Sequence, residues 1–288
     1  MQYEGRIFRP PNEADAILLQ ATVGCSHNSC RFCGMYRLKR FRVRSLDEIA
    51  RDIEQARVEY PKVGRVFLCD GDALAMPHLQ LVAVLEAIRD RLPEVIWISS
   101  YANAISVARK SDAELAELRS LNLKLFHMGL ESGDAVTLER MQKPGTPQFH
   151  VDQAARAHAS NIKLFVTVLL GIGGRERSQA HALATAQVLT GMNPSRVGAL
   201  SLMMIPGTPM YADMEQGAFE LPSPQEMLQE LRTIVAHTEM RGILYANHAS
   251  NYLPLRARLP RDRTFALAEI DAALQGRVAL KPEWLRGV

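Results

Sequence analysis

Cysteine is scarce in this sequence: its 288 residues include four cysteines, and three of them fall between residues 25 and 33. Long apolar runs are missing altogether, and none reaches the length that crosses a membrane. Nothing at the N-terminus resembles a signal peptide, and a formal net charge of +3 gives no strong basic excess that would indicate nucleic acid. With 47% hydrophobic and 23% charged residues, we expect a cytoplasmic globular protein with a substantial core.

The three clustered cysteines, Cys25, Cys30 and Cys33, have the spacing C-x4-C-x2-C. Three thiolates supplied by so short a segment indicate a metal site. If they hold a [4Fe–4S] cluster, one iron lacks a cysteine and keeps an open position for chemistry. The alternative is a structural zinc site, in which His27 or Cys69 completes the four ligands. A disulfide is the weaker alternative in a chain of cytoplasmic character.

Apolar runs alternate with helix-start signals at steps of about thirty residues, which is the rhythm of βα units. Strands are predicted over residues 16–23, 65–69, 95–101, 124–130, 163–170 and 196–204. Helices are predicted over residues 45–60, 77–91, from 111 onward, 151–160 and 178–189. The pattern predicts an α/β fold with a parallel sheet, and it fits a doubly wound sheet and an incomplete barrel equally well.

Beyond residue 209 the alternation changes. Ser223-Pro-Gln-Glu226 opens a further helix, with proline at the first helical position. A strand-like segment follows at 243–246, and another helix is predicted over about residues 263–275. We expect residues 210–288 to form a C-terminal α/β extension and residues 1–15 to form a polar N-terminal segment.

The cysteine segment resembles the cluster loop of the radical S-adenosylmethionine (radical SAM) enzymes. In that family an aromatic residue precedes the last cysteine, and Phe32 has that position here. The usual family spacing is C-x3-C-x2-C, so the first gap is one residue longer in this chain. The resemblance implies that Cys25, Cys30 and Cys33 ligate three irons of a [4Fe–4S] cluster, and that SAM binds the fourth.

The resemblance also implies a fold and a reaction. The fold is a partial (β/α)6 TIM-like barrel, expected over residues 16–209. The turn at 206–209 and the segment 42–45 resemble the branch that contains elongator-type enzymes and methylthiotransferases. The implied reaction is reductive cleavage of SAM to a 5′-deoxyadenosyl radical, which abstracts hydrogen from a substrate. A reduced flavodoxin- or ferredoxin-like protein would donate the electron, and we expect a small-molecule substrate because no RNA-binding module is recognisable.

Polar residues follow the second predicted strand, at the edge where parallel α/β folds bind ligands. Asp70, Gly71 and Asp72 occupy the place of the family's Gly-Gly-Glu, which holds the amino group of SAM. Two aspartates replace the first glycine and the glutamate of that motif. The alternative is a loop whose aspartates cap the next helix.

Two later predicted strands also end in residues that the resemblance assigns to SAM. Glu131 resembles the residue that meets the ribose hydroxyls, and a carboxylate can accept both of them. Gly171 and Gly173 would let the backbone approach the adenine, because glycine has no Cβ. The alternatives are a surface turn for Glu131 and an ordinary glycine turn for the other two.

Six basic residues follow the first cysteines, and they are either a solvated loop or a site where one or two of them meet an anion. They are Arg31, Arg37, Lys39, Arg40, Arg42 and Arg44. By contrast, His127 and Cys69 lie within predicted strands and are expected in the core.

The run from Asn247 to Tyr252 is rich in hydrogen-bonding groups and follows a predicted strand. We predict that His248 and Tyr252 face the substrate and act in catalysis. The alternative is a packed polar turn that satisfies its own backbone groups.

Overall fold

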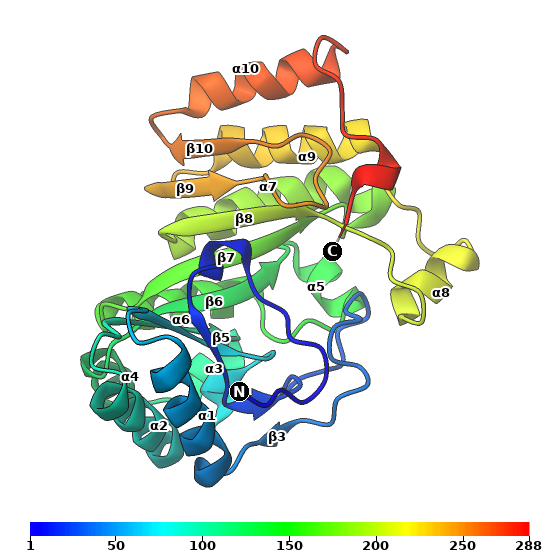
Figure 1. The fold of residues 1–288 in the computed structure, drawn as a ribbon. Helices are drawn as coiled ribbons and strands as arrows, with labels where there is room; N and C mark the ends of the chain where they lie inside the picture. The colour runs from blue at the N-terminus through cyan, green and yellow to red at the C-terminus, as the bar shows by residue number, and fades with distance from the viewer. Residues whose placement is uncertain (288) are drawn as a thin grey trace. The chain divides into compact units, whose positions relative to one another are not determined.

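A computed structural model describes residues 1–287, and the chain divides into two compact units. Unit 1 comprises residues 1–28, 35–128 and 155–164, and unit 2 comprises residues 29–34, 129–154 and 165–288. Strands β6 (Leu123–Glu131) and β7 (Lys163–Leu170) and helix α6 (Pro147–Ala159) each contribute residues to both units. Figure 1 labels the elements along the chain.

Unit 1 is built on parallel strands in the order β1, β4, β5 and β6, with helices α1, α2 and α4 grouped beside one another. Its elements are η1 (Pro11–Glu13), β1 (Ile17–Gln20), β2 (Thr22–Val23), β3 (Arg42–Val43), α1 (Leu46–Glu59), β4 (Arg65–Cys69), η2 (Ala73–Ala75), α2 (His78–Arg91), β5 (Trp97–Ala102), α3 (Ala104–Ala108) and α4 (Asp112–Ser120). Strands β4 and β5 are almost fully buried; β4 is a continuous apolar run after Arg65, whereas β5 buries Ser99 and Ser100.

Unit 2 continues the alternation of strand and helix. Strands β7, β8 and β9 are parallel neighbours, β10 pairs antiparallel with β9, and helix α9 packs against α7 and α10. The remaining elements are α5 (Ala135–Arg140), α7 (Gly174–Met192), β8 (Arg196–Ser201), α8 (Pro209–Glu215), α9 (Pro224–His237), β9 (Gly242–Tyr245), β10 (Arg256–Leu259), α10 (Arg263–Leu274) and η3 (Glu283–Leu285). The predicted α/β class is confirmed.

Local helix-start signals placed three helices correctly. Ser45, Ser111 and Ser223 each accept a hydrogen bond from the backbone N–H three residues on, and the glutamate at that position bonds back. These capping boxes satisfy backbone donors that the first turn of a helix leaves unpaired. Each helix therefore begins at the residue after its serine.

The prediction of one strand over residues 16–23 was wrong. Strand β1 ends at Gln20, and β2 leaves its direction to pair antiparallel with β3. The guanidinium of Arg44 holds this break, donating to the Gln20 carbonyl at 2.9 Å and to Asp52 at 2.6 Å. Helices α6 and α7 are also longer than predicted, and no helix in the described chain has the length and apolar character needed to cross a bilayer.

Candidate functional site

In unit 1, the turn after β4 is bonded to the start of the cysteine segment. The Asp70 carboxylate accepts the Gly24 N–H at 2.7 Å, and the Gly71 N–H donates to the Gly24 carbonyl at 2.9 Å. Lys39 and Gln20 also donate to this fully buried carboxylate. The side chain of Asp70 therefore fixes the backbone that delivers the first cysteine.

Gly71 is required by the packing of this turn. A Cβ at position 71 would lie 2.6 Å from the Cβ of Cys25 and 2.9 Å from Cε2 of Tyr36, closer than real carbon contacts allow. Any larger residue would push the Cys25 segment away from the turn. The glycine predicted to face the cofactor thus has a steric reason to be glycine.

Asp72 is a buried carboxylate with one satisfied and one unsatisfied oxygen. Its Oδ2 accepts hydrogen bonds from the Ser26 hydroxyl and from Asn103 Nδ2, the latter at 2.7 Å. Its Oδ1 has no partner among the described residues. Burial raises the pKa of Asp72 above its ordinary value, although the nearby side chains of Ser26, Ser106 and Asn103 oppose that shift. A buried, unpaired carboxylate oxygen is costly unless a donor meets it.

A second buried polar atom lies beside the same turn. The hydroxyl of Tyr36, a residue only 4% exposed, also has no partner in the described part of the chain. Two unmatched polar atoms around Gly71 fit a polar ligand that completes them, and a cationic amine suits the oxygen of Asp72. On this test, the residues present fit a bound amino-acid group.

In unit 2, the segment with Cys30 and Cys33 is fixed by its backbone. The N–H of Arg31 donates to the Met141 carbonyl at 3.0 Å, and the Arg31 carbonyl accepts from Met210 at 3.1 Å. The Cys33 N–H donates to the Cys30 carbonyl at 3.2 Å, which closes a turn between the two cysteines. The C-x2-C spacing thus produces a tight turn held at its second residue.

Phe32 lies inside that turn and packs on a hydrophobic cluster of unit 2. Its ring contacts the group formed by Met141, Ile172, Leu202, Met210 and Phe219. The aromatic residue before the last cysteine therefore has a packing role in the same segment. Its predicted contact with the cofactor stays a prediction.

The four cysteines differ in accessibility. Cys25, Cys30 and Cys33 are half-buried thiols, whereas Cys69 is fully buried in β4, where burial raises the pKa of its thiol far above the usual range. Cys69 packs in an apolar cluster, as the sequence predicts for a core residue. In residues 1–287 no three His, Cys, Asp or Glu side chains are closed into a metal-binding group, and Cys25 belongs to unit 1 while the other two belong to unit 2.

Glu131 ends strand β6 in a left-handed backbone conformation, with φ at +66°. Its side chain is 10% exposed, and Oε1 accepts from Lys143 Nζ at 3.1 Å. A left-handed conformation in a non-glycine residue costs free energy and is typical of functional or ligand-holding positions. The carboxylate retains acceptor capacity beyond its single bond to Lys143.

The glycine turn after β7 is held by helix α9. The Gly171 N–H donates to Oε2 of Glu230 at 2.6 Å, and φ at Gly171 is +87°. A Cβ at this position would lie 2.7 Å from Cε of Met227. Gly173 precedes helix α7, which begins at Gly174. Gly171 is therefore glycine for both a conformational and a steric reason.

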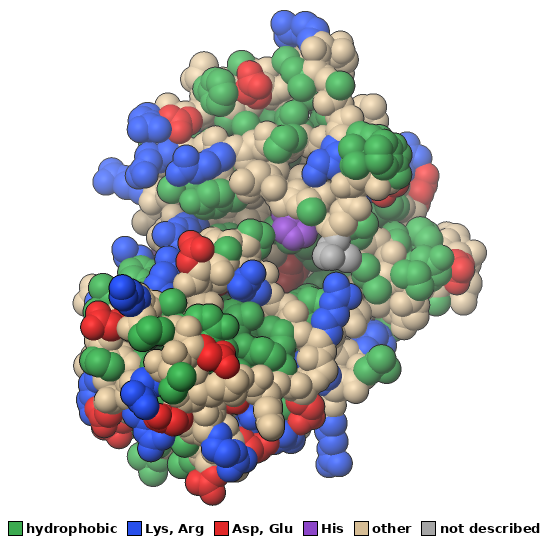
Figure 2. All heavy atoms as spheres, in the orientation of Figure 1, with side chains coloured by type: hydrophobic (Ala, Val, Ile, Leu, Met, Phe, Trp, Pro, Cys, Tyr) green, Lys and Arg blue, Asp and Glu red, His purple; other side chains and the backbone are tan. Residues whose placement is uncertain are grey.

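Most of the six basic residues pair with carboxylates of their own unit. Arg31 pairs with Asp213, Lys39 with Asp70, Arg42 with Glu4 and Glu48, and the buried Arg44 with Asp52. Four of the six therefore have carboxylate partners, and the predicted contact of one or two basic residues with an anion stays a prediction. Basic and acidic side chains are likewise interspersed over the face seen in Figure 2.

His248 and Tyr252 bond to residues near them in the C-terminal part of unit 2. Nδ1 of His248 lies 2.9 Å from the Ser250 hydroxyl, and the Tyr252 hydroxyl donates to Glu283 at 2.7 Å. The guanidinium of Arg286 stacks 4.0 Å from the centre of the Tyr252 ring. These contacts match the packed polar turn that the sequence left open, and the catalytic role of both residues stays a prediction.

Sequence reasoning missed Asn103, Ser26 and Tyr36. Asn103 directly follows β5, so the strand-end rule that selected Asp72 and Glu131 also applies to it. Ser26 lies between the first two cysteines, and Tyr36 lies three residues after the last one.

Comparison with known proteins gives a family and a fold. The family model described as the radical SAM superfamily matches residues 19–186, and no curated protein matches the chain. Among solved structures, methylornithine synthase (PylB) is 12% identical, with a TM-score of 0.56 over 88% of this chain and 68% of its own. Coproporphyrinogen III oxidase (HemN) from Escherichia coli is 15% identical, with a TM-score of 0.59 over 85% and 56%.

A third solved structure is the radical S-adenosylmethionine methyltransferase TsrM from Kitasatospora setae, with cobalamin and a [4Fe–4S] cluster bound. It is 13% identical, with a TM-score of 0.54 over 70% of this chain and 37% of its own. This chain therefore spans about two thirds, one half and one third of the three compared chains. At these identities the likeness shows the fold, an α/β partial barrel of the TIM-like type.

Proposed function

Because the chain belongs to the radical SAM superfamily, we propose that it cleaves SAM reductively and uses the resulting radical on a small-molecule substrate. Enzymes of this superfamily require a [4Fe–4S] cluster and SAM, a reductant and a substrate. When bound together, the cluster and SAM supply a one-electron cleavage that gives methionine and a 5′-deoxyadenosyl radical, which abstracts hydrogen from the substrate. The unpaired, buried Oδ1 of Asp72 is the observation that carries the proposal.

We assign the cluster ligands to Cys25, Cys30 and Cys33, within a core that we place at residues 16–209. Their half-buried thiols suit ligands that must ionise, whereas the pKa of Cys69 is raised by burial. The tight turn between Cys30 and Cys33 and the steric fit of Gly71 against Cys25 each fix one part of the segment.

Residues at three strand ends would each bind a different part of SAM. We propose that Asp72 accepts the SAM amine, because an ammonium donor would satisfy its Oδ1. Glu131 would accept the ribose hydroxyls with the lone pairs that Lys143 leaves unused. The Gly171 and Gly173 turn would let the adenine lie against backbone.

The proposal is tested by metal analysis and product analysis of anaerobically purified, reconstituted protein. About four iron and four sulfide per chain are expected, with 5′-deoxyadenosine formed when SAM and a chemical reductant are added. One zinc per chain and no 5′-deoxyadenosine would overturn the proposal in favour of a structural zinc protein.

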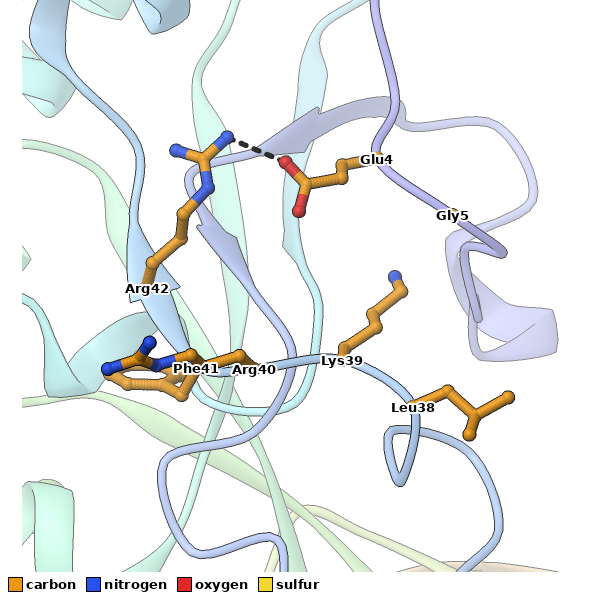
Figure 3. A pocket seen from close by; sticks show the side chains of 7 residues that line it. All are labelled: Glu4, Gly5, Leu38, Lys39, Arg40, Phe41 and Arg42. Atoms are coloured by element: carbon orange, nitrogen blue, oxygen red, sulfur yellow. Dashed lines mark hydrogen bonds and ion pairs between the residues drawn. The ribbon is translucent and has the colours of Figure 1, made fainter.

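We also propose where the electron donor binds. Leu38 is fully exposed at 102%, and Arg40 beside it has no ion pair within the described residues. Both line a concavity of about 540 Å³ in unit 1, together with Phe41 and Arg42 (Figure 3). The charge of Arg40, unpaired among the described residues, and the exposed apolar side chain of Leu38 on the same surface suit an acidic flavodoxin- or ferredoxin-like partner, because opposite charges steer association.

The Arg40→Glu variant tests that surface. We expect the KM for an acidic protein donor to rise about tenfold, while cleavage driven by dithionite is unchanged. Steady-state rates at two ionic strengths measure it, and Arg57→Glu on α1 is the charge-matched control. Equal KM values for the Arg40→Glu and wild-type proteins would place the donor elsewhere.

The substrate role of Tyr252 can be separated from its structural role. In the Tyr252→Phe variant we expect substrate turnover to fall about tenfold while cleavage of SAM without substrate continues. If the role of Tyr252 is purely structural, the substitution would lower the midpoint of thermal unfolding, because the bond to Glu283 is lost. The turnover rate per folded molecule would then be unchanged. His248→Ala is expected to behave like Tyr252→Phe, and Tyr60→Phe on the exposed end of α1 serves as control.

A further inference from the structure

A cluster of buried polar side chains in unit 2 lies between two turns, Ser132–Gly133 after β6 and Gly171–Gly174 after β7. Its members are Ser132, His181, Thr185 and Glu230, with Ser178 at its edge. Of these, His181 and Thr185 are fully buried and Glu230 is 1% exposed. None of these residues is assigned a role in the proposed reaction.

Glu230 is the member that reaches the glycine turn. Its Oε2 accepts the Gly171 N–H at 2.6 Å, and its Oε1 accepts the Ser178 hydroxyl at 2.7 Å. Burial raises the pKa of this carboxyl to about 7. A carboxyl group buried this deeply on an amphipathic helix costs stability, so apolar packing alone does not account for it.

His181 lies between Glu230 and the other turn. The Ser132 hydroxyl accepts the Asp134 N–H and lies 2.8 Å from His181 Nδ1. The Thr185 hydroxyl accepts the Gly133 N–H and lies 3.3 Å from the same nitrogen. Each hydroxyl oxygen accepts its backbone proton through one lone pair and still has its own proton, and the closer one, on Ser132, can donate to Nδ1.

We assign to His181 the tautomer in which Nδ1 accepts from Ser132. Burial lowers the pKa of the imidazole to about 4, so the ring is neutral at pH 7. With Nδ1 as the acceptor, the proton is on Nε2, which has no hydrogen-bond partner among the described residues and lies 3.7 Å from Oε2 of Glu230. The Nε2–H dipole therefore faces the carboxyl group that holds Gly171.

We propose that Glu230 is a positioning residue that fixes the Gly171 turn relative to the Ser132 strand end, and so shapes the surface that receives the adenosyl part of SAM. The inference rests on the proposed function, which assigns Gly171 to the adenine and the neighbouring Glu131 to the ribose. Met227, one turn away on α9, supports the same turn by packing against Gly171. A segment beyond the family-matched residues 19–186 thereby controls the cofactor surface.

The test compares Glu230→Leu with Glu230→Gln in reconstituted full-length protein. Leucine removes both acceptors at similar volume, so amide exchange of the peptide covering 168–174, measured without SAM, should accelerate about tenfold or more. The Kd for SAM, measured by calorimetric titration, should rise about tenfold. Glutamine can accept from Gly171 and donate to Ser178, so both quantities should return to within about threefold of wild type.

The control is Glu239→Leu, at an exposed glutamate just beyond the end of α9. The proposal is overturned if Glu230→Leu binds SAM as wild type does, or if its exchange accelerates only outside 168–174. Should Glu230→Leu fail to fold, Ser178→Ala removes one bond of the same carboxyl group, and unchanged exchange at 168–174 would then overturn the proposal. A failure of the proposed function is distinct, because wild-type protein itself would then lack iron or SAM binding.

Discussion

Replacing any one of Cys25, Cys30 and Cys33 with alanine is expected to remove most of the bound iron and to abolish SAM cleavage. A three-cysteine cluster has no spare ligand, so the loss of one thiolate leaves two irons without a protein ligand. Iron and sulfide content, the visible absorbance of the reconstituted protein and 5′-deoxyadenosine formation measure the effect.

Cys69→Ala is the matched control for these variants. Cys69 is fully buried in β4, and burial keeps its thiol protonated by raising the pKa. We expect Cys69→Ala to lose stability because of the small cavity it creates, and to keep its iron and its activity. If Cys69→Ala also lost its iron, all four ligands would be cysteines, and the open iron that SAM requires would not exist.

The parts of the fold that could be predicted from the sequence depend on neighbouring residues. The helices that begin after Ser45, Ser111 and Ser223 could be predicted, because the signals that start them lie within four consecutive residues. The buried strands were predicted because parallel strands covered on both faces are continuous apolar runs. The break after Gln20 was missed because it depends on Arg44, which is 24 residues away.

In the candidate site, too, the features set by neighbouring residues could be predicted and those set by distant residues could not. The turn at Asp70 to Asp72 could be predicted because ligand-binding residues of a parallel sheet follow its strands directly. Which oxygen of Asp72 is unsatisfied depends on Ser26 and Asn103, which are 46 and 31 residues away. No spacing rule connects such residues.

The cluster of Glu230 and His181 carries no sequence signal at all. Both residues lie in the middle of helices, where a lone glutamate or histidine is usually on the solvated face. Their burial follows from the packing of α9 against α7. The positions of Glu230 and His181 therefore indicate a role only when the residues packed around them are known.

Asp72→Asn is expected to weaken SAM binding about tenfold to a hundredfold while the cluster stays assembled. A charge-assisted hydrogen bond to a buried carboxylate contributes about 1.5–3 kcal/mol, and an asparagine in its place offers the SAM amine a neutral oxygen or a repelling N–H. The asparagine can still accept from Ser26 and Asn103 through its remaining oxygen, so the turn itself should keep its shape. Calorimetric titration of SAM into the reconstituted variant measures the affinity, and iron content shows whether the cluster is intact.

The sign of the stability change distinguishes a ligand-holding carboxylate from a structural one. Because burial raises the pKa of Asp72 above its ordinary value, the folded state binds the proton more tightly than the unfolded chain does. The Asp72 carboxyl is thus most favourable to folding at low pH, and its contribution is lost as the pH rises through its folded-state pKa. Without SAM, Asp72→Asn should therefore unfold at a higher temperature than wild type at pH 8, whereas Asp47→Asn, on the exposed first turn of α1, should not. A variant that loses stability at pH 8 yet binds SAM with unchanged affinity would show that Asp72 maintains the fold and does not hold the SAM amine.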